Sequence, residues 1–194
     1  MSPRSARSRY STVAIAFHWV IALLLIGNLI AGLWLLDPLL HSSDPETKQW
    51  GFWLIQVHKS GGLTVLVLAV ARLAWRLINP PPPYPDHMGT AEKVLAKLSH
   101  WGFYALMLAL PLSGWAMVST GKISFPISYF GLFEVPLLPL SKAFGEQFDA
   151  SHTILGWLTL ALIVLHVAAA LKHHYWDRDD VLVRILPGLR QRFS

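Results

Sequence analysis

Residues 151–175 read SHTILGWLTLALIVLHVAAALKHHY, an apolar run with no acidic residue. A helix needs roughly 20 apolar residues to cross a bilayer, so this run predicts a membrane-spanning helix. His152 and His166 interrupt it 14 residues apart. Because a helix turns by about 100° and rises about 1.5 Å per residue, their side chains fall on nearly the same face, roughly 21 Å apart. This helix is therefore expected to present one imidazole near each face of the membrane.

Three further apolar runs of similar length precede this one, and we predict spans at residues 13–36, 53–78, 98–120 and 151–175. The composition agrees, because 54% of the 194 residues are hydrophobic and only 14% are charged, whereas about a quarter of an average soluble chain is charged. The first run resembles a signal peptide, but it is too long for one and no small-residue cleavage site follows, so we expect it to be retained. The sequence predicts an all-α, integral membrane four-helix bundle that forms a single domain over residues 1–194.

This composition excludes disordered chains, disulfide-linked secreted scaffolds and ordinary cytosolic enzymes. The chain contains no cysteine, which excludes iron–sulfur clusters, thiolate zinc sites, thioester chemistry and covalently attached haem. Its net charge of +5 is typical of the basic cytoplasmic flanks of a membrane protein. We therefore expect membrane lipids around the chain and no nucleic acid partner.

The segments between the predicted spans carry turn signals. Residues 37–52 form a short polar connection in which Asp37-Pro38 and Asp44-Pro45 predict turns. Residues 79–97 open with four prolines after Asn79, which predict a stiff spacer. Residues 121–150 are expected to lie along the membrane surface, with a short helix around residues 140–148. Pro111, inside the third span, predicts a kink whose free backbone groups Ser113 and its neighbours satisfy.

Lysine and arginine set the expected orientation. With four spans both termini share one side, and that side holds 12 of the 16 basic residues, which leaves on the other side only Lys48, Lys59, Lys122 and Lys142. Cytoplasmic loops of membrane proteins are enriched in basic residues. Both termini are therefore expected in the cytoplasm of a bacterium, with the chain in its inner membrane.

Four histidines lie inside the apolar spans, where ionisable groups are costly and are functional candidates by default. By depth they form two pairs: His18 with His166 near the cytoplasmic face, and His58 with His152 near the opposite face. Paired imidazoles from facing helices are what a bis-histidine haem requires. Two such haems, one above the other, would form a path for electrons across the bilayer.

Neighbouring residues fit this interpretation. Small residues that could make room for the macrocycle follow the histidines: Gly61, Gly62, Gly156 and residues 168–170. Cations that could bind the haem propionates lie near the membrane surface: Arg72, Arg76 and Arg9 on the cytoplasmic side, and Lys59 on the other.

Other interpretations stay open at this point. Any one of the four histidines, taken alone, could instead be a hydrogen-bonding residue of the bundle. Zinc or copper transport is disfavoured, because such sites usually include carboxylates or sulfur ligands and the span interiors contain no acidic residue. His100 opens the third span and could bind a propionate, line a quinone pocket, or replace His18 as a ligand. His41 and His87 are expected to be solvated, and His173 and His174 to lie at the membrane interface.

Several motifs, in this order and spacing, make the chain resemble the bacterial cytochrome b561 family of four-helix, diheme b-type cytochromes. They are IAFHW at residues 15–19, VHKSG at 57–61, RLAWR at 72–76, HWGFY at 100–104, LPLSG at 110–114, SH at 151–152 and LHVAAALKHHY at 165–175. The resemblance covers nearly the whole chain. It implies two non-covalent b haems, whose axial ligands to iron would be His58 with His152 and His18 with His166.

The resemblance also implies electron exchange with the ubiquinone pool. In similar superoxide:ubiquinone oxidoreductases the donor is periplasmic superoxide, an anion that Lys59, Lys122 or Lys142 could attract. Two alternatives remain: a cytochrome b membrane anchor of a periplasmic dehydrogenase or hydrogenase, in which residues 121–150 dock the partner, and a haem-free transporter or scaffold bundle. A homodimer or a periplasmic redox partner also stays open, because Gly27 and Gly32 are too weak a dimer signal.

Overall fold

Four long helices make up most of the molecule. The computed structural model describes residues 9–85, 88–121 and 125–186. Its elements, in chain order, are α1 (Thr12–Ile30), a π-helical turn (Ala31–Leu35), α2 (Leu36–Leu40), α3 (Pro45–Ile78), α4 (Thr90–Thr120), β1 (Ile127–Tyr129), β2 (Phe133–Val135), a 3₁₀ turn (Lys142–Phe144), α5 (Gly145–Lys172) and a second π-helical turn (His173–Asp177). His87 and Lys122, named above, lie outside the described ranges, as do four of the basic residues counted on the side of the termini: Arg4, Arg7, Arg190 and Arg192.

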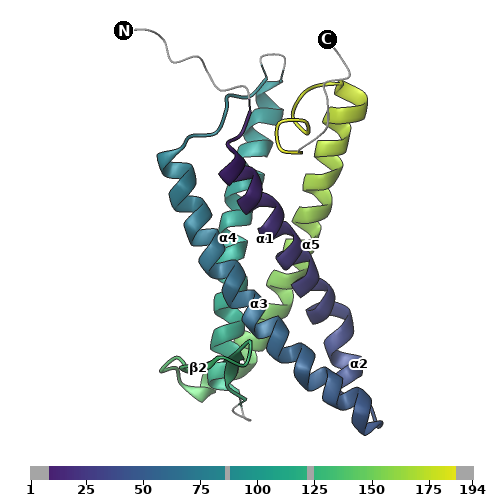
Figure 1. Cartoon of the computed structure of the whole chain (residues 1–194), viewed down its shortest axis with the longest axis vertical. Coiled ribbons are helices and arrows are strands. Elements are labelled where there is room, and N and C mark those ends of the chain that lie inside the picture. Colours follow the sequence, from purple (N-terminus) through teal and green to yellow (C-terminus); the bar gives the residue numbers. More distant parts are fainter. Residues whose placement is uncertain (1–8, 86–87, 122–124, 187–194) are drawn as a thin grey trace.

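The helices run lengthwise beside one another, as Figure 1 shows. α1 begins and α5 ends at the same end of the bundle, whereas α2 and the small β-hairpin lie at the opposite end. α4 packs most extensively against α5, and α3 packs against both α1 and α4. Within the part of the chain that the structure describes, four helical segments are long and apolar enough to cross a membrane: Thr12–Leu40, Pro45–Ile78, Thr90–Thr120 and Lys142–Asp177. The predicted helical membrane bundle is confirmed.

The helices extend beyond the predicted spans, and the turn predicted at Asp37-Pro38 is wrong. Both residues lie in α2, which continues the helical segment Thr12–Leu40 after the π-helical turn Ala31–Leu35. Helices accommodate proline at such irregular turns. Asp44 and Pro45 instead start α3: the Asp44 carboxylate accepts a hydrogen bond from the Thr47 backbone N–H at 2.8 Å, and Pro45 is the first helical residue. The predicted polar connection is therefore mostly helix.

Residues 125–144 form a compact cap on the end of the bundle rather than a plain loop. β1 and β2 pair antiparallel, with Ile127 opposite Val135. The turn between the strands needs positive φ at Phe130 and Gly131, a conformation that glycine adopts without strain. The short helix predicted around residues 140–148 is present from Lys142, but it is not a separate element, because the 3₁₀ turn Lys142–Phe144 runs directly into α5 at Gly145.

The cap is held to α3 through two polar side chains, the buried Ser60 and the half-buried Gln56. The Ser60 hydroxyl is fully buried; it donates to the Gln56 carbonyl at 2.8 Å and accepts from the Phe130 backbone N–H at 3.0 Å. Gln56 adds two hydrogen bonds, to the Pro126 carbonyl at 3.1 Å and from the Ser128 N–H at 3.2 Å. The two side chains of α3 thus supply hydrogen-bond partners to three backbone groups of the cap: the Phe130 N–H, the Pro126 carbonyl and the Ser128 N–H.

Ser60→Ala should therefore destabilise the fold. The variant removes the hydroxyl that accepts from the Phe130 N–H, and the loss of such a hydrogen bond costs roughly 1 kcal/mol. We expect a lower thermal unfolding midpoint in detergent. Ser151→Ala is the matched control, because the exposed Ser151 hydroxyl donates to a carbonyl of its own helix. Equal midpoints for both variants would show that the cap does not depend on Ser60.

An apolar layer fills the middle of the bundle. It consists of Ile21, Leu25, Leu29, Val65, Ala69, Tyr104, Met107 and Leu110. On α1 these residues lie between His18 and Gly32, and on α3 they lie between His58 and Arg72. The layer therefore separates two levels of polar side chains, one toward each end of the helices.

Candidate functional site

The structure brings the four span histidines together as two pairs. The ring centroids of His58 on α3 and His152 on α5 lie 6.2 Å apart, and we call these the hairpin-side pair. The ring centroids of His18 on α1 and His166 on α5 lie 6.4 Å apart, and we call these the terminus-side pair. α5 contributes one histidine to each pair, as the 14-residue spacing predicts.

In the hairpin-side pair the ring nitrogen Nδ1 of each histidine contacts a backbone carbonyl. His58 Nδ1 lies 3.2 Å from the Asn28 oxygen, and His152 Nδ1 lies 3.1 Å from the Leu110 oxygen. A carbonyl oxygen only accepts hydrogen bonds, so Nδ1 must carry the proton in both rings. The Nε2 atoms then keep the lone pairs with which a histidine binds a metal. Both rings are in the tautomer that ligation through Nε2 requires.

Two glycines make room for the rings of this pair. A Cβ atom on Gly32 would lie 2.9 Å from His58 Cε1, and one on Gly114 would lie 2.8 Å from His152 Cε1. Such contacts are closer than real Cβ atoms tolerate, so each imidazole packs directly on a glycine of a neighbouring helix. The sequence indicated other glycines: a Cβ on Gly61 would meet Asn28 instead, and one on Gly62 would meet nothing within 4 Å.

The terminus-side pair is arranged differently. Arg72 Nη2 lies 3.3 Å from His18 Nδ1. A guanidinium only donates, so this Nδ1 accepts and the proton of His18 sits on Nε2. Ligation through Nε2 there requires that the proton leave this nitrogen and that Arg72 turn away from Nδ1.

His100 is a third histidine at this level. Its ring centroid lies 6.0 Å from that of His166, slightly closer than that of His18 at 6.4 Å. His100 Nδ1 is buried and has no hydrogen-bond partner among the described residues. The Phe103 ring packs against His166 at 5.1 Å. The structure thus places both candidate partners, His18 and His100, beside His166.

The predicted cations occupy distinct positions. The Arg72 guanidinium lies 5.8 Å from the centre of the Tyr104 ring, inside the bundle. Arg76 is half-buried near Tyr10, whose pKa is raised by burial against the opposing effect of this charge. Arg9 is exposed just before α1. Arg72 is therefore the cation closest to the terminus-side pair.

Lys59 contacts the cap through Phe125. Its Nζ atom donates to the Phe125 carbonyl at 2.8 Å and lies 4.5 Å from the centre of the Phe125 ring. Lys59 therefore holds the segment that leads into β1. It also places a positive charge at this end of the bundle. Lys142 is exposed in the 3₁₀ turn before α5.

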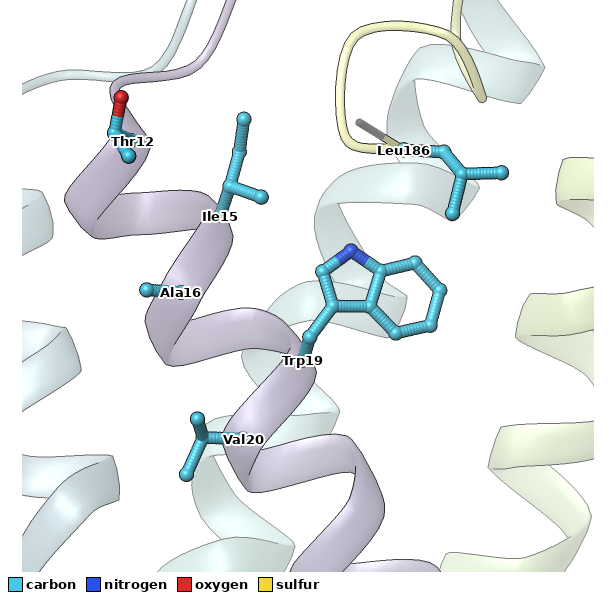
Figure 2. A pocket seen from close by; sticks show the side chains of 6 residues that line it. All are labelled: Thr12, Ile15, Ala16, Trp19, Val20 and Leu186. Atoms are coloured by element: carbon cyan, nitrogen blue, oxygen red, sulfur yellow. The ribbon is translucent and has the colours of Figure 1, made fainter. Parts of the chain in front are cut away.

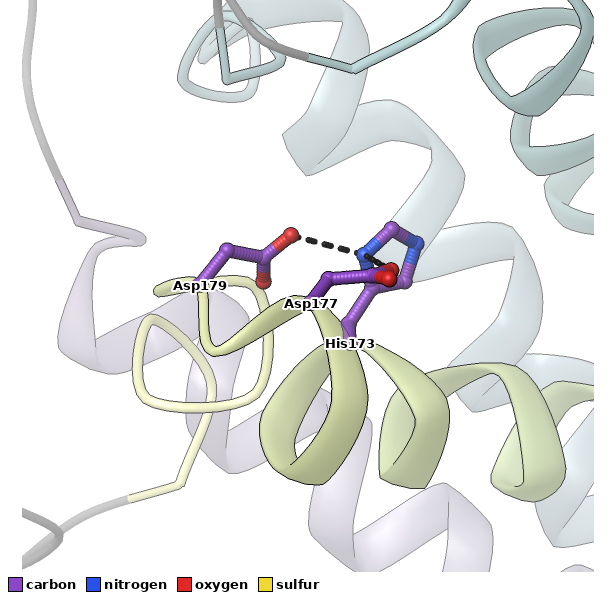
Figure 3. A group of neighbouring side chains, drawn as sticks. All are labelled: His173, Asp177 and Asp179. Carbon is purple, nitrogen blue, oxygen red and sulfur yellow. Dashed lines mark hydrogen bonds and ion pairs between the residues drawn. The ribbon is translucent and has the colours of Figure 1, made fainter.

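Sequence reasoning missed a polar cluster at the end of α5, shown in Figure 3. The buried His173 Nδ1 lies 2.7 Å from Asp179 Oδ2 and 3.2 Å from Asp177 Oδ2. The Lys172 ammonium pairs with Asp177 at 2.7 Å and with Glu92 of α4 at 2.8 Å. Although one imidazole and two carboxylates could hold a metal ion, Lys172 already supplies a cation. The cluster ties the end of α5 to α4 and to the segment that follows.

An open apolar groove of about 450 Å³ lies along the first turns of α1 (Figure 2). It is lined by Thr12, Ile15, Ala16, Trp19, Val20 and Leu186. The Trp19 indole N–H donates to the Ile185 carbonyl at 2.9 Å, and its ring lies 5.1 Å from that of His18. The groove is suited to a hydrocarbon chain rather than to a ring that needs hydrogen bonds.

Comparison with known proteins identifies the family of this chain. The sequence profile of prokaryotic cytochrome b561 matches residues 9–188. The chain belongs to the prokaryotic cytochrome b561 family. It is 36% identical over 192 residues to cytochrome b561 homolog 2 of Escherichia coli K12, covering 96% of this chain and 95% of the relative. It is 32% identical over 182 residues to the "Probable superoxide oxidase CybB" of Yersinia pestis, covering 94% and 98%. Cytochrome b561 homolog 1 of Escherichia coli K12 is 28% identical over 186 residues, covering 93% and 98%.

Family membership confirms the resemblance seen in the motifs. This b561 protein is a multi-pass membrane cytochrome of the bacterial inner membrane, and its family implies that it binds haem b. The chemistry of the hairpin-side pair fits that group, because both rings keep Nε2 free and both pack on glycine. Membership also weighs against the haem-free transporter or scaffold.

Proposed function

We propose that this b561 protein is a diheme cytochrome that carries electrons between a periplasmic donor and the ubiquinone pool. The observation that carries the proposal is the pairing of histidines at two levels, with an apolar layer between them. His58 with His152 would hold one haem, and His18 with His166 the other. When bound, haem b supplies a one-electron ferric–ferrous couple; the protein supplies ligation, burial and access.

The chain's own residues have separate roles in this proposal. The Asn28 and Leu110 carbonyls keep the protons of His58 and His152 on Nδ1. Arg72 lies beside His18, where its charge would favour a propionate or another anion. The apolar layer would exclude water between the two levels. The apolar groove lined by Trp19 would hold a hydrocarbon chain near His18, whose ring Trp19 contacts.

The proposed orientation places the terminus-side pair toward the cytoplasm. Among the described residues the basic side chains favour that end of the bundle, where Arg9, Arg72, Arg76, Lys93, Lys97, Lys172, Arg178 and Arg184 lie, against Lys48, Lys59 and Lys142 at the other end. Cytoplasmic flanks carry the excess of Lys and Arg. The hairpin-side pair and the cap would then face the periplasm.

Superoxide is the donor that we propose, since one relative is named as a probable superoxide oxidase. Two superoxide anions would each lose one electron and leave as dioxygen, while one ubiquinone takes up both electrons and two protons. Purified protein with a superoxide-generating system and a soluble ubiquinone should form ubiquinol, and added superoxide dismutase should abolish the reaction. Ubiquinol formation that dismutase does not affect would contradict superoxide as donor.

Lys59→Gln tests the electrostatic part of this proposal. Lys59 is a cation at the cap, on a face that also carries acidic residues, and its charge would attract the superoxide anion. Its loss should therefore slow superoxide-driven turnover several-fold. The effect should be larger at low ionic strength, where salt screens the charge less. Lys142→Gln, which removes an exposed charge from the same side, is the control. Haem spectra of both variants verify the fold. Unchanged superoxide kinetics in Lys59→Gln would remove this residue from the proposal.

A second candidate is a membrane-anchor cytochrome that docks a periplasmic dehydrogenase or hydrogenase. It is favoured by the apolar tip of the cap, where Phe130 is 51%, Leu132 77% and Phe133 58% exposed. Stable co-purification with such a partner, together with no turnover by the chain alone, would favour the anchor over the superoxide oxidase.

A further inference from the structure

We propose that Ser113 of α4 is a positioning residue for His152, and that its hydroxyl lowers the reduction potential of the iron held there. The inference rests on the proposed function, in which His58 and His152 bind one haem. It adds to that function a difference between the two proposed ligands, because the Ser113 hydroxyl contacts His152 and not His58.

Ser113 makes a short relay of hydrogen bonds at His152. Its side chain is buried, with 8% of its surface exposed. The hydroxyl donates to the Leu110 carbonyl at 2.8 Å, and its oxygen lies 3.1 Å from His152 Nδ1. Since the hydroxyl proton is directed to the carbonyl, its oxygen is free to accept from the imidazole. Because the Ser113 hydroxyl donates to the Leu110 carbonyl, the Ser113 oxygen becomes a better hydrogen-bond acceptor.

Three neighbouring residues of α4 thus surround one side of the His152 ring. The Leu110 carbonyl and the Ser113 hydroxyl both lie 3.1 Å from Nδ1, and Gly114 leaves the space that Cε1 occupies. His58 has a simpler environment, in which Nδ1 contacts the Asn28 carbonyl at 3.2 Å and Gly32 leaves the space beside the ring. The hydroxyl is the difference between the two ligands.

An acceptor on Nδ1–H increases the electron donation of an imidazole through Nε2. Greater donation stabilises ferric over ferrous iron and lowers the reduction potential. Ser113→Ala removes one of two acceptors and leaves the Leu110 carbonyl. We therefore expect the equilibrium to shift toward ferrous iron by roughly threefold to tenfold; a tenfold shift in a one-electron couple is about 59 mV.

Ser113 could stabilise the fold without affecting the reduction potential, because buried hydroxyls often bond a carbonyl of their own helix. A control variant has to separate these two roles. Ser119→Ala is the matched control. Ser119 is buried on the same helix and donates to the Trp115 carbonyl at 2.8 Å, but it accepts from the Leu138 backbone N–H rather than from an imidazole. A structural effect would lower the unfolding midpoint in both variants and leave the potentials unchanged.

The experiment is a spectroelectrochemical titration of the purified holoprotein, with electron paramagnetic resonance of its ferric state. We expect Ser113→Ala to raise one of the two midpoint potentials and to alter the ferric signal of that haem, with Ser119→Ala as wild type. Ser113→Thr, which keeps a hydroxyl, should restore the native potential. Ser113→Cys has similar volume and a weaker acceptor, so it should give a smaller shift of the same sign, even if the alanine variant does not assemble.

Two results would overturn the inference: unchanged potentials in both the alanine and cysteine variants, or an equal shift in Ser119→Ala. The proposed function fails separately, if His58→Ala and His152→Ala both keep the wild-type haem content. Loss of a haem in His152→Ala with an unchanged potential in Ser113→Ala would leave the ligand assignment intact and reject only the role of Ser113.

Discussion

Gly114→Ala is expected to remove most of the haem from the hairpin-side pair. The new methyl group would lie 2.8 Å from His152 Cε1, and the ring cannot move aside without losing its contacts to Leu110 and Ser113. Disturbing the groups that orient a metal ligand typically costs 10–100-fold in affinity. The haem content of the purified protein should therefore fall from two per chain toward one, measured by the pyridine haemochrome assay.

Gly32→Ala should have the same consequence through His58, whose Cε1 would lie 2.9 Å from the added Cβ. Gly27→Ala and Gly62→Ala are the matched controls, because a Cβ at either position meets nothing within 4 Å. Both controls should keep two haems. Full haem content in Gly114→Ala and Gly32→Ala would contradict a binding site at the hairpin-side pair.

The second large effect concerns the histidines themselves. His58→Ala and His152→Ala should lose the same haem, and His18→Ala and His166→Ala should lose the other, since one remaining imidazole holds a bis-histidine haem poorly. Redox titration distinguishes the two pairs of variants, because the haem that remains in one pair has a different midpoint potential from the haem that remains in the other. His41→Ala, at the exposed end of α2, should lose neither. Loss of both haems in every histidine variant would indicate misfolding rather than ligation.

His100 makes the terminus-side assignment testable in its own right. We expect His100→Ala to keep two haems with an altered spectrum, and His18→Ala to lose one. The opposite result would show that His100 is the partner of His166, which their 6.0 Å separation also allows. The ligand at this level would then come from α4 instead of α1.

The sequence could predict the level of each functional residue but not its neighbours on other helices. A fixed rise per residue gives depth, so the pairing of His58 with His152 and of His18 with His166 follows from four spans and their direction. Which face of a helix meets which neighbour depends on side-chain packing, which a single sequence does not reveal. For this reason the sequence indicated Gly61 and Gly62 rather than Gly32 and Gly114.

Other differences have local causes. Ser113 was expected to compensate for Pro111, and its hydroxyl does bond the Leu110 carbonyl, but its contact with His152 depends on the position of α5. The strands β1 and β2 contain three residues each, too few for alternation of polar and apolar residues to reveal them. The contact between His173 Nδ1 and Asp179 depends on how the chain folds back after α5.

The central claim is that the chain holds two b haems, one at each histidine pair. The most direct test is the haem-to-protein ratio of the purified wild-type chain, expressed with ample haem, together with its reduced-minus-oxidised spectrum. We expect two haems per chain and b-type bands that titrate as two components. One haem per chain would contradict the diheme assignment, and a colourless protein would contradict haem binding by this chain altogether.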